Sequence, residues 1–164
     1  MDNTKHTLVA LVEDKPGVLN RIARLFRRRN FNIQSLAVGS SEHPGLSRMT
    51  IVVGGDAAQV EQVRKQLEKL INVVKVSDIT EENMVSRELA LIKVKATTTT
   101  RSEIMQIVGI FRANIVDVGP NSLTVEVTGD EDKVNSLLGL LHDFGVKELS
   151  RTGRIALTRG SNPF

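Results

Sequence analysis

The chain has 164 residues, of which 40% are hydrophobic, and its net charge at pH 7 is only +3. Aromatic residues make up 3% and are all Phe, so Val, Ile and Leu must build the core. The absence of cysteine excludes disulfides, thiolate nucleophiles and Cys-ligated metals. No apolar run approaches the ~20 residues needed to cross a bilayer, and the polar start of the chain shows no signal peptide. We expect a cytoplasmic protein that binds neither membrane nor, given its weak charge, nucleic acid.

The first half of the chain predicts a βαββαβ order, because its hydrophobic period switches between that of strands and that of helices. The predicted elements are a strand over 7–13, a helix from Val18, strands over 31–39 and 46–53, a helix with Val60 to Leu70 inward, and a strand over 73–79. This order is the ferredoxin-like plan.

The second half repeats the plan. Its predicted elements are a strand over 88–96, a helix over 101–111, strands over 115–118 and 123–127, a helix over 130–144, and an extended segment from Val146. The fold class is therefore α+β, with two tandem ferredoxin-like domains. We predict a first domain over residues 1–79, a polar linker over 80–87 and a C-terminal domain over 88–164.

Each predicted sheet has helices on one face only, which leaves the other face to be covered. Apolar residues on both faces of the strand over 49–53 point the same way. We expect another subunit or the sister domain to cover these faces, and therefore a homodimer.

The sequence offers no catalytic or metal-binding constellation. Its histidines, His6, His43 and His142, form no pair at metal-ligand spacing. The serines before His43 have no orienting acid, so a solvated turn is the better interpretation. An RNA-recognition domain shares the βαββαβ order but needs aromatic residues on its central strands to stack bases, and these strands have none.

The strongest charge feature is the run Arg27-Arg28-Arg29 at the end of the first predicted helix. Cations at this position complement the helix dipole by a few tenths of a kcal/mol each. The same run could dock an acidic partner, and the two interpretations are compatible.

The turn Asp14-Lys15-Pro16-Gly17, followed by Val18 and Leu19, is the region with the clearest chemical potential. Pro16 stiffens the turn, and Gly17 allows a close backbone approach. We expect the N–H groups of Val18 and Leu19 to be unpaired at the positive end of a helix, where they suit a small carboxylate.

An amino acid also needs acceptors for its ammonium group. Asp14 offers a carboxylate, and Asn32 offers a side-chain carbonyl if it comes from a facing subunit. Ile33 and Leu36 would supply apolar surface for an aliphatic side chain. The alternative is an ordinary strand-to-helix turn in which Asp14 caps the helix.

The sequence resembles the small regulatory subunits of acetolactate synthase (acetohydroxyacid synthase), whose N-terminal part is an ACT domain. The resemblance covers nearly the full chain. The segments that carry it are Leu11 to Leu19, Asn30 to Leu36, Leu46 to Ile51, Arg87 to Val94, Ile110 to Val118 and Arg151-Thr152-Gly153.

The resemblance implies a regulatory role in branched-chain amino-acid (valine and isoleucine) biosynthesis, with no catalytic site and no cofactor in this chain. It implies a large catalytic subunit that uses thiamine diphosphate, Mg²⁺ and FAD, which the small subunit activates and makes sensitive to feedback inhibition by valine. It also implies a homodimer through the ACT domains. The effector would lie at their interface, against the seven residues Asp14, Pro16, Gly17, Val18, Leu19, Asn32 and Ile33.

Asp14 departs from the family pattern, in which Asn is frequent at this position. An added carboxylate attracts an ammonium group but repels a nearby carboxylate. The ligand turn by itself also fits a free-standing ACT-type amino-acid sensor that acts on a different partner, and this remains the alternative function.

Overall fold

The computed structural model describes residues 4–164, and residues 1–3 of the predicted first domain lie outside this range. The first ferredoxin-like repeat consists of β1 (Lys5–Glu13), α1 (Val18–Arg28), β2 (Ile33–Ser40), β3 (Leu46–Gly54), α2 (Ala57–Glu68) and β4 (Val73–Asp78). The second consists of β5 (Met84–Lys95), α3 (Arg101–Ile110), β6 (Asn114–Val118), β7 (Ser122–Gly129), α4 (Glu131–His142) and β8 (Val146–Arg151), and β9 (Ile155–Thr158) follows.

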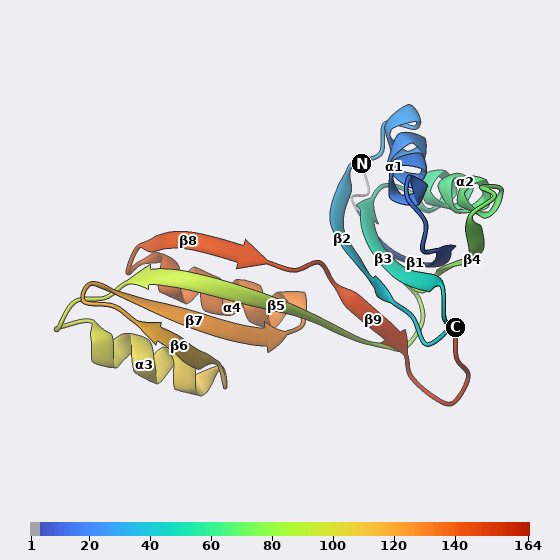
Figure 1. Cartoon of the computed structure of the whole chain (residues 1–164). Helices are drawn as coiled ribbons and strands as arrows, with labels where there is room; N and C mark the ends of the chain where they lie inside the picture. Colours follow the sequence, from blue (N-terminus) through green and yellow to red (C-terminus); the bar gives the residue numbers. More distant parts are fainter. Residues whose placement is uncertain (1–3) are drawn as a thin grey trace. The chain divides into compact units, whose positions relative to one another are not determined.

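The strands form two antiparallel sheets with equivalent orders, β2-β3-β1-β4 and β6-β7-β5-β8. In each sheet the first and last strands of the βαββαβ repeat lie side by side, as the ferredoxin-like plan requires. Helices α1 and α2 cover one face of the first sheet, and α3 and α4 cover one face of the second (Figure 1). The predicted α+β class is confirmed. No helix among residues 4–164 is long and apolar enough to span a membrane.

The first core lies between the sheet and its two helices. Helix α1 buries Val18, Ile22 and Phe26, which recur at intervals of four residues and so share one face of the helix. These side chains pack against alternate residues of β1 and β3, whose pleat points every second side chain toward the helices. The helical stripe predicted from Val18 onward is therefore the buried face of α1.

The second core repeats this arrangement. Its helix α4 begins at a side-chain cap, which α1 lacks. Helix α4 buries Val134, Leu137 and Leu141. Its start is capped by Asp130, whose side chain accepts a hydrogen bond from the Lys133 backbone N–H at 2.9 Å. Asp56 caps α2 through the Gln59 N–H in the same way. A cap of this kind satisfies a backbone donor that the helix itself cannot pair.

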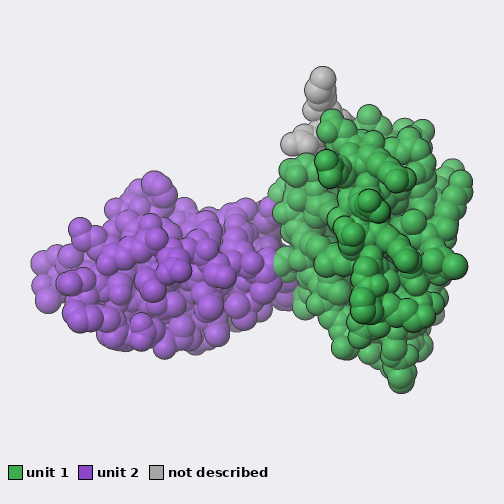
Figure 2. Space-filling view, turned by 45° about the horizontal axis from the view of Figure 1, so that its top comes forward, with its two compact units in different colours: residues 1–85, 153–164 green, residues 86–152 purple. Residues whose placement is uncertain are grey.

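The chain divides into two compact units at positions other than the predicted boundaries (Figure 2). The first unit comprises residues 1–85 and 153–164, and the second comprises residues 86–152. The last twelve residues of the predicted C-terminal domain over 88–164 thus belong to the first unit. The predicted linker over 80–87 also contains the start of β5, with which β9 pairs.

The far face of the first sheet is covered by this chain itself. Val9 on that face is fully buried in a small cluster with Ile79 and Ala156, against which Met84 and Phe164 pack. The covering segment, β9 and its flanks, belongs to the predicted C-terminal domain over 88–164, so this face needs no second subunit, and the homodimer stays a prediction.

The far face of the second sheet is mostly polar. A shallow hollow of about 240 Å³ on it is lined by Lys93 and Glu148, which form an ion pair at 3.1 Å, and by Thr124 and Ser150. Leu91 is partly exposed beside them. A face of this composition can stay in contact with water, so it gives no reason to expect a covering subunit.

Candidate ligand-binding site

The turn between β1 and α1 is anchored by a polar network at the end of the first sheet. The Glu13 carboxylate accepts from Lys15 Nζ at 2.8 Å and from Asn72 Nδ2 at 3.0 Å. The Asn72 side-chain oxygen in turn accepts from the Arg21 guanidinium. Asp14 is held by its backbone N–H, which donates to the Gly45 carbonyl at 2.9 Å. Three segments therefore fix the backbone on which the predicted site depends.

Glu13, Arg21 and Asn72 were not among the predicted site residues. The hydrogen bonds from Lys15 and then Asn72, together with the positive charge of Lys15, hold the pKa of Glu13 below its usual range. A charged residue at the end of an otherwise apolar strand is a visible sign of such a role. Asn72, however, lies 59 positions away along the chain and has no local pattern to identify it.

The start of α1 has no side-chain cap. Gly17 occupies the N-cap position in the left-handed region, with φ 85° and ψ −9°, a conformation that favours glycine. No acidic residue lies in the first turn of the helix. Within residues 4–164, the Asp14 carboxylate has no hydrogen-bond or ion-pair partner. The alternative in which Asp14 caps the helix is therefore excluded.

The free donors at this helix end are shifted by one residue from the prediction. The Val18 N–H donates to the Lys15 carbonyl at 3.4 Å, which is long for a hydrogen bond, and the Val18 side chain belongs to the core. Across the described part of the chain, the N–H groups of Leu19 and Asn20 have no backbone acceptor. Leu19 also exposes 49% of its surface beside them.

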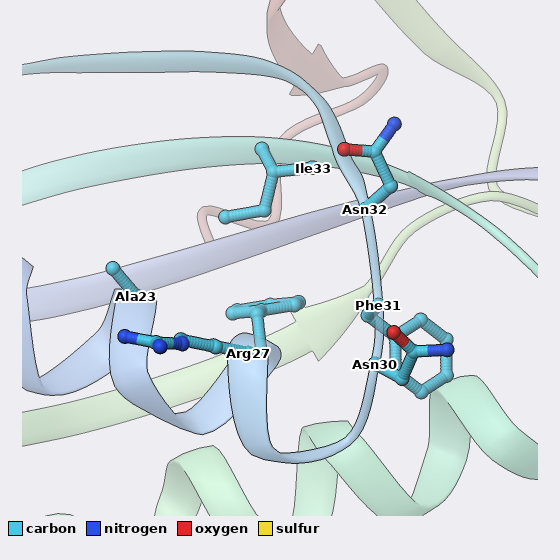
Figure 3. Close-up of a pocket in the computed structure, with 7 residues that line it drawn as sticks. Ala23, Arg27, Asn30, Phe31, Asn32 and Ile33 are labelled. Carbon is cyan, nitrogen blue, oxygen red and sulfur yellow. The ribbon is translucent and has the colours of Figure 1, made fainter.

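Asn32 ends the connection from α1 to β2 and Ile33 begins β2, both beside an open hollow of about 390 Å³. Ala23 and Arg27 on α1 form its other wall, with Asn30 and Phe31 at the bend (Figure 3). Asn32 also lines a second hollow, of about 520 Å³, next to Gln59 and Gln62 on α2. These surfaces combine amide groups with aliphatic and aromatic carbon.

The two halves of the predicted site lie at opposite ends of the first sheet. Glu13, just before the turn, pairs with Leu46 of β3, whereas Ile33 pairs with Val53 of the same strand. Seven residues along a strand correspond to about 23 Å. One protomer therefore cannot bring Asp14 and Asn32 to one small ligand, and the supply of Asn32 and Ile33 by a neighbouring subunit stays a prediction.

The other polar clusters have structural roles. The Ser41 hydroxyl donates to the Leu46 carbonyl at 2.8 Å and accepts from the His43 N–H at 3.1 Å, so it closes the predicted turn. No group of His, Asp and Glu among residues 4–164 could hold a metal ion. Arg27, Arg28 and Arg29 are exposed around the end of α1, where they complement its dipole.

Two family models match the chain, one in each half. Residues 8–75 match the ACT domain of acetohydroxyacid synthase small-subunit-like proteins. Residues 87–160 match the model of the small subunit of acetolactate synthase. Together they span both units of the structure.

Curated proteins of similar sequence match over almost the whole chain. A probable acetolactate synthase small subunit from Archaeoglobus fulgidus is 59% identical over 96% of this chain and 98% of its own length. The acetolactate synthase small subunit of Mycobacterium bovis is 54% identical over 98% and 95%. The crystal structure of the acetolactate synthase small subunit from Thermotoga maritima is 45% identical, with a TM-score of 0.88, and the match covers 97% of this chain and 99% of that one.

Proposed function

The chain belongs to the family of acetolactate synthase small subunits, and from this premise we propose that it activates a catalytic subunit and confers feedback inhibition by valine. The observation that carries the proposal is the uncapped start of α1, where free backbone donors lie beside the Asp14 turn. A helix start without a cap suits an anionic group of a ligand.

The ligand carboxylate binds the N–H groups of Leu19 and Asn20. Gly17 leaves open space around the helix end, because no atom lies within 4 Å of the position a Cβ would take there. The partial positive charge of the helix terminus favours the anion. The absence of acidic residues in the first turn removes a repulsion that would oppose it.

The ligand ammonium group binds the carbonyl of Asn32 from a second copy and, on the other side, the carboxylate of Asp14. Ile33 of that copy and the exposed side chain of Leu19 enclose the aliphatic part.

Two copies supply the complete site when their α1–β2 sides pack about a two-fold axis. β2 is an edge strand of the first sheet and carries a half-exposed Val38. A two-fold axis reverses the strand direction, so the start of one β2 lies beside the end of the other. Ser40, at that end, pairs with Ser47, next to the residue that pairs with Glu13. The Asn32 end of one copy therefore meets the Asp14 end of its partner.

The catalytic partner would be an acetolactate synthase large subunit that carries thiamine diphosphate, Mg²⁺ and FAD. These groups would supply the carbon–carbon bond chemistry there, while this chain holds the effector. A free-standing amino-acid sensor would need the same ligand turn but no such partner. Co-purification with a large subunit from the source cells separates the two functions, because only the regulatory subunit is expected to bring it down.

Calorimetric titration of the full-length protein tests ligand binding directly. We expect L-valine to bind and valinamide, which lacks the carboxylate, to give no heat. Asn32→Ala should weaken valine binding by roughly tenfold or more, since the buried ammonium group of the ligand loses a hydrogen-bond partner. Asn121→Ala, at an exposed asparagine of the second unit, serves as the matched control and should bind normally.

Reconstitution with the large subunit completes the test. Catalytic activity should rise when this chain is added and fall again when valine is added. Absence of binding heat with millimolar valine would contradict the sensor role. Valine binding without any change in the activity of the large subunit would instead favour the free-standing sensor.

A further inference from the structure

The polypeptide crosses between the two units twice. It leaves the first unit after Val85 and enters it again at Gly153. Residues 153–164, here called the C-terminal strap, then lie against the far face of the first sheet, with Ala156 in the buried cluster around Val9. The second unit is thus connected to the first at two points of the chain, and the strap is one of them.

The strap begins with a close backbone contact to β2. A Cβ added at Gly153 would lie 2.6 Å from the carbonyl oxygen of Leu36 and 2.7 Å from its carbonyl carbon. Real Cβ atoms do not approach backbone atoms this closely, so any side chain at position 153 must move the strap away from β2. The contact therefore requires glycine for reasons of space.

Arg154 fixes the strap to two strands. Its backbone N–H donates to the Ser35 hydroxyl of β2 at 3.2 Å, and its guanidinium donates to the buried Thr7 hydroxyl of β1 at 2.9 Å. Farther along, Arg48 of β3 donates to the Ala156 carbonyl at 2.8 Å. The guanidinium of Arg48 also lies 5.3 Å from the centre of the Phe164 ring, a cation–π contact at the end of the strap.

The strand that holds the strap is the strand that begins at the proposed ligand site. Asn32 and Ile33 precede Ser35 by only three and two residues. Between Ile33 and Ser35 the pairing of β2 with β3 shifts register, so this short segment departs from the regular ladder. A shifted register leaves backbone groups less firmly paired and allows the segment to take up a displacement.

We propose that the contact of Gly153 and Arg154 with β2 couples two events. One is binding of a ligand at Asn32 and Ile33. The other is docking of the strap on Ser35 and Leu36, where the chain passes from the second unit back into the first. This inference rests on the proposed function. A ligand held by Asn32 and Ile33 fixes the start of β2, and a fixed Ser35 favours the docked strap. Coupling is reciprocal. Undocking the strap therefore lowers the affinity for the ligand by the same factor by which bound ligand raises the equilibrium constant for docking.

The test combines calorimetry with amide hydrogen exchange on the full-length protein, with L-valine as the probe. In the wild type, valine should slow exchange at residues 154–158 by about fivefold or more, at the lower end of typical coupling factors. Gly153→Ala should raise the Kd for valine by a similar factor and abolish the valine-dependent change in exchange. Ser35→Ala, a milder substitution that removes only the acceptor for the Arg154 N–H, should act in the same direction.

Gly139→Ala is the matched control, because Gly139 lies in α4 of the second unit and no atom lies within 4 Å of its Cβ position. It should leave both measurements unchanged. If the wild type binds valine, and Gly153→Ala and Ser35→Ala bind it with unchanged Kd, the strap has only a structural role and the inference is wrong. A wild type that does not bind valine contradicts the proposed function itself, and the coupling with it.

Discussion

At the scale of single residues, the turn before α1 is set by charges and hydrogen bonds that leave its ligand-facing groups free. The Glu13 carboxylate accepts hydrogen bonds from Lys15 and from Asn72. The Asp14 carboxylate has no hydrogen-bond or ion-pair partner within the described residues and remains able to meet an ammonium group. Gly17 supplies the left-handed conformation that turns the chain into the helix.

The lowered pKa of Glu13 predicts a specific dependence of stability on pH. Because its folded pKa lies below the unfolded value, the ionised carboxylate stabilises the fold above the unfolded pKa of about 4.3. This stabilisation is lost as the pH falls through the folded pKa. Urea unfolding between pH 3 and 7 should therefore give the wild type a higher free energy of unfolding than Glu13→Gln near neutrality. The difference should vanish in acid.

Glu81→Gln provides the comparison, since Glu81 is an exposed glutamate of the polar linker. The unfolding curves of Glu81→Gln should coincide with those of the wild type at every pH. A gap between wild type and Glu13→Gln that persists unchanged down to pH 3 would show that the ionisation of Glu13 is not what holds the turn. High salt should reduce the difference in free energy of unfolding between the wild type and Glu13→Gln, because the ion pair of Glu13 with Lys15 is accessible to solvent.

At the scale of elements, the helix starts fall into two kinds. Helices α2 and α4 begin at aspartates that accept a backbone N–H, whereas α1 begins at an uncapped glycine. Helix α3 also lacks a side-chain cap bond, but Glu103 lies in its first turn and the hydroxyls of Thr97 and Thr100 close the preceding turn. Among the helices of residues 4–164, only α1 therefore combines an uncapped start with a first turn that lacks acidic residues.

Asp130→Ala tests whether the caps stabilise the fold as their geometry indicates. The substitution leaves the Lys133 N–H without its acceptor and should lower the free energy of unfolding by about 1 kcal/mol. Asp130→Asn keeps a side-chain oxygen at the cap and should lose much less. Equal losses in the two variants, measured by urea unfolding, would assign the effect to charge rather than to the capping bond.

The hydrophobic pattern of the sequence was sufficient to predict most of these elements, because each buries one face. Val18, Ile22 and Phe26 mark α1 by spacing alone. The start of β5 at Met84 and the separate strand β9 could not be predicted in this way. They pair with each other across a long stretch of chain, and the polar start of β5 shows no strand pattern of its own. The covering of Val9 by Ala156 is equally non-local.

At the scale of the whole molecule, a repeat visible in the sequence does not coincide with the division into compact units. The second repeat is inserted into the first unit, which the strap completes. The predicted site residues were likewise assigned to one domain, yet they lie about 23 Å apart in one copy. The sequence predicted that a facing subunit would supply Asn32 and Ile33, but not this separation, because the separation depends on the register of β1 and β2 against β3.

The proposed ligand site is shared between two copies, and mixing two defective variants tests this most directly. Gly17→Asp places a negative charge at the exposed helix start, and Asn32→Ala removes a group from the opposite half, so neither variant alone should bind valine with wild-type affinity. A mixed dimer contains one doubly altered site and one intact site. Equal mixing should thus restore wild-type affinity at about a quarter of the sites, as counted by calorimetry. If the mixture contains no site of wild-type affinity while exchange of subunits is demonstrated, the two halves do not belong to one site across the dimer and the shared site is contradicted.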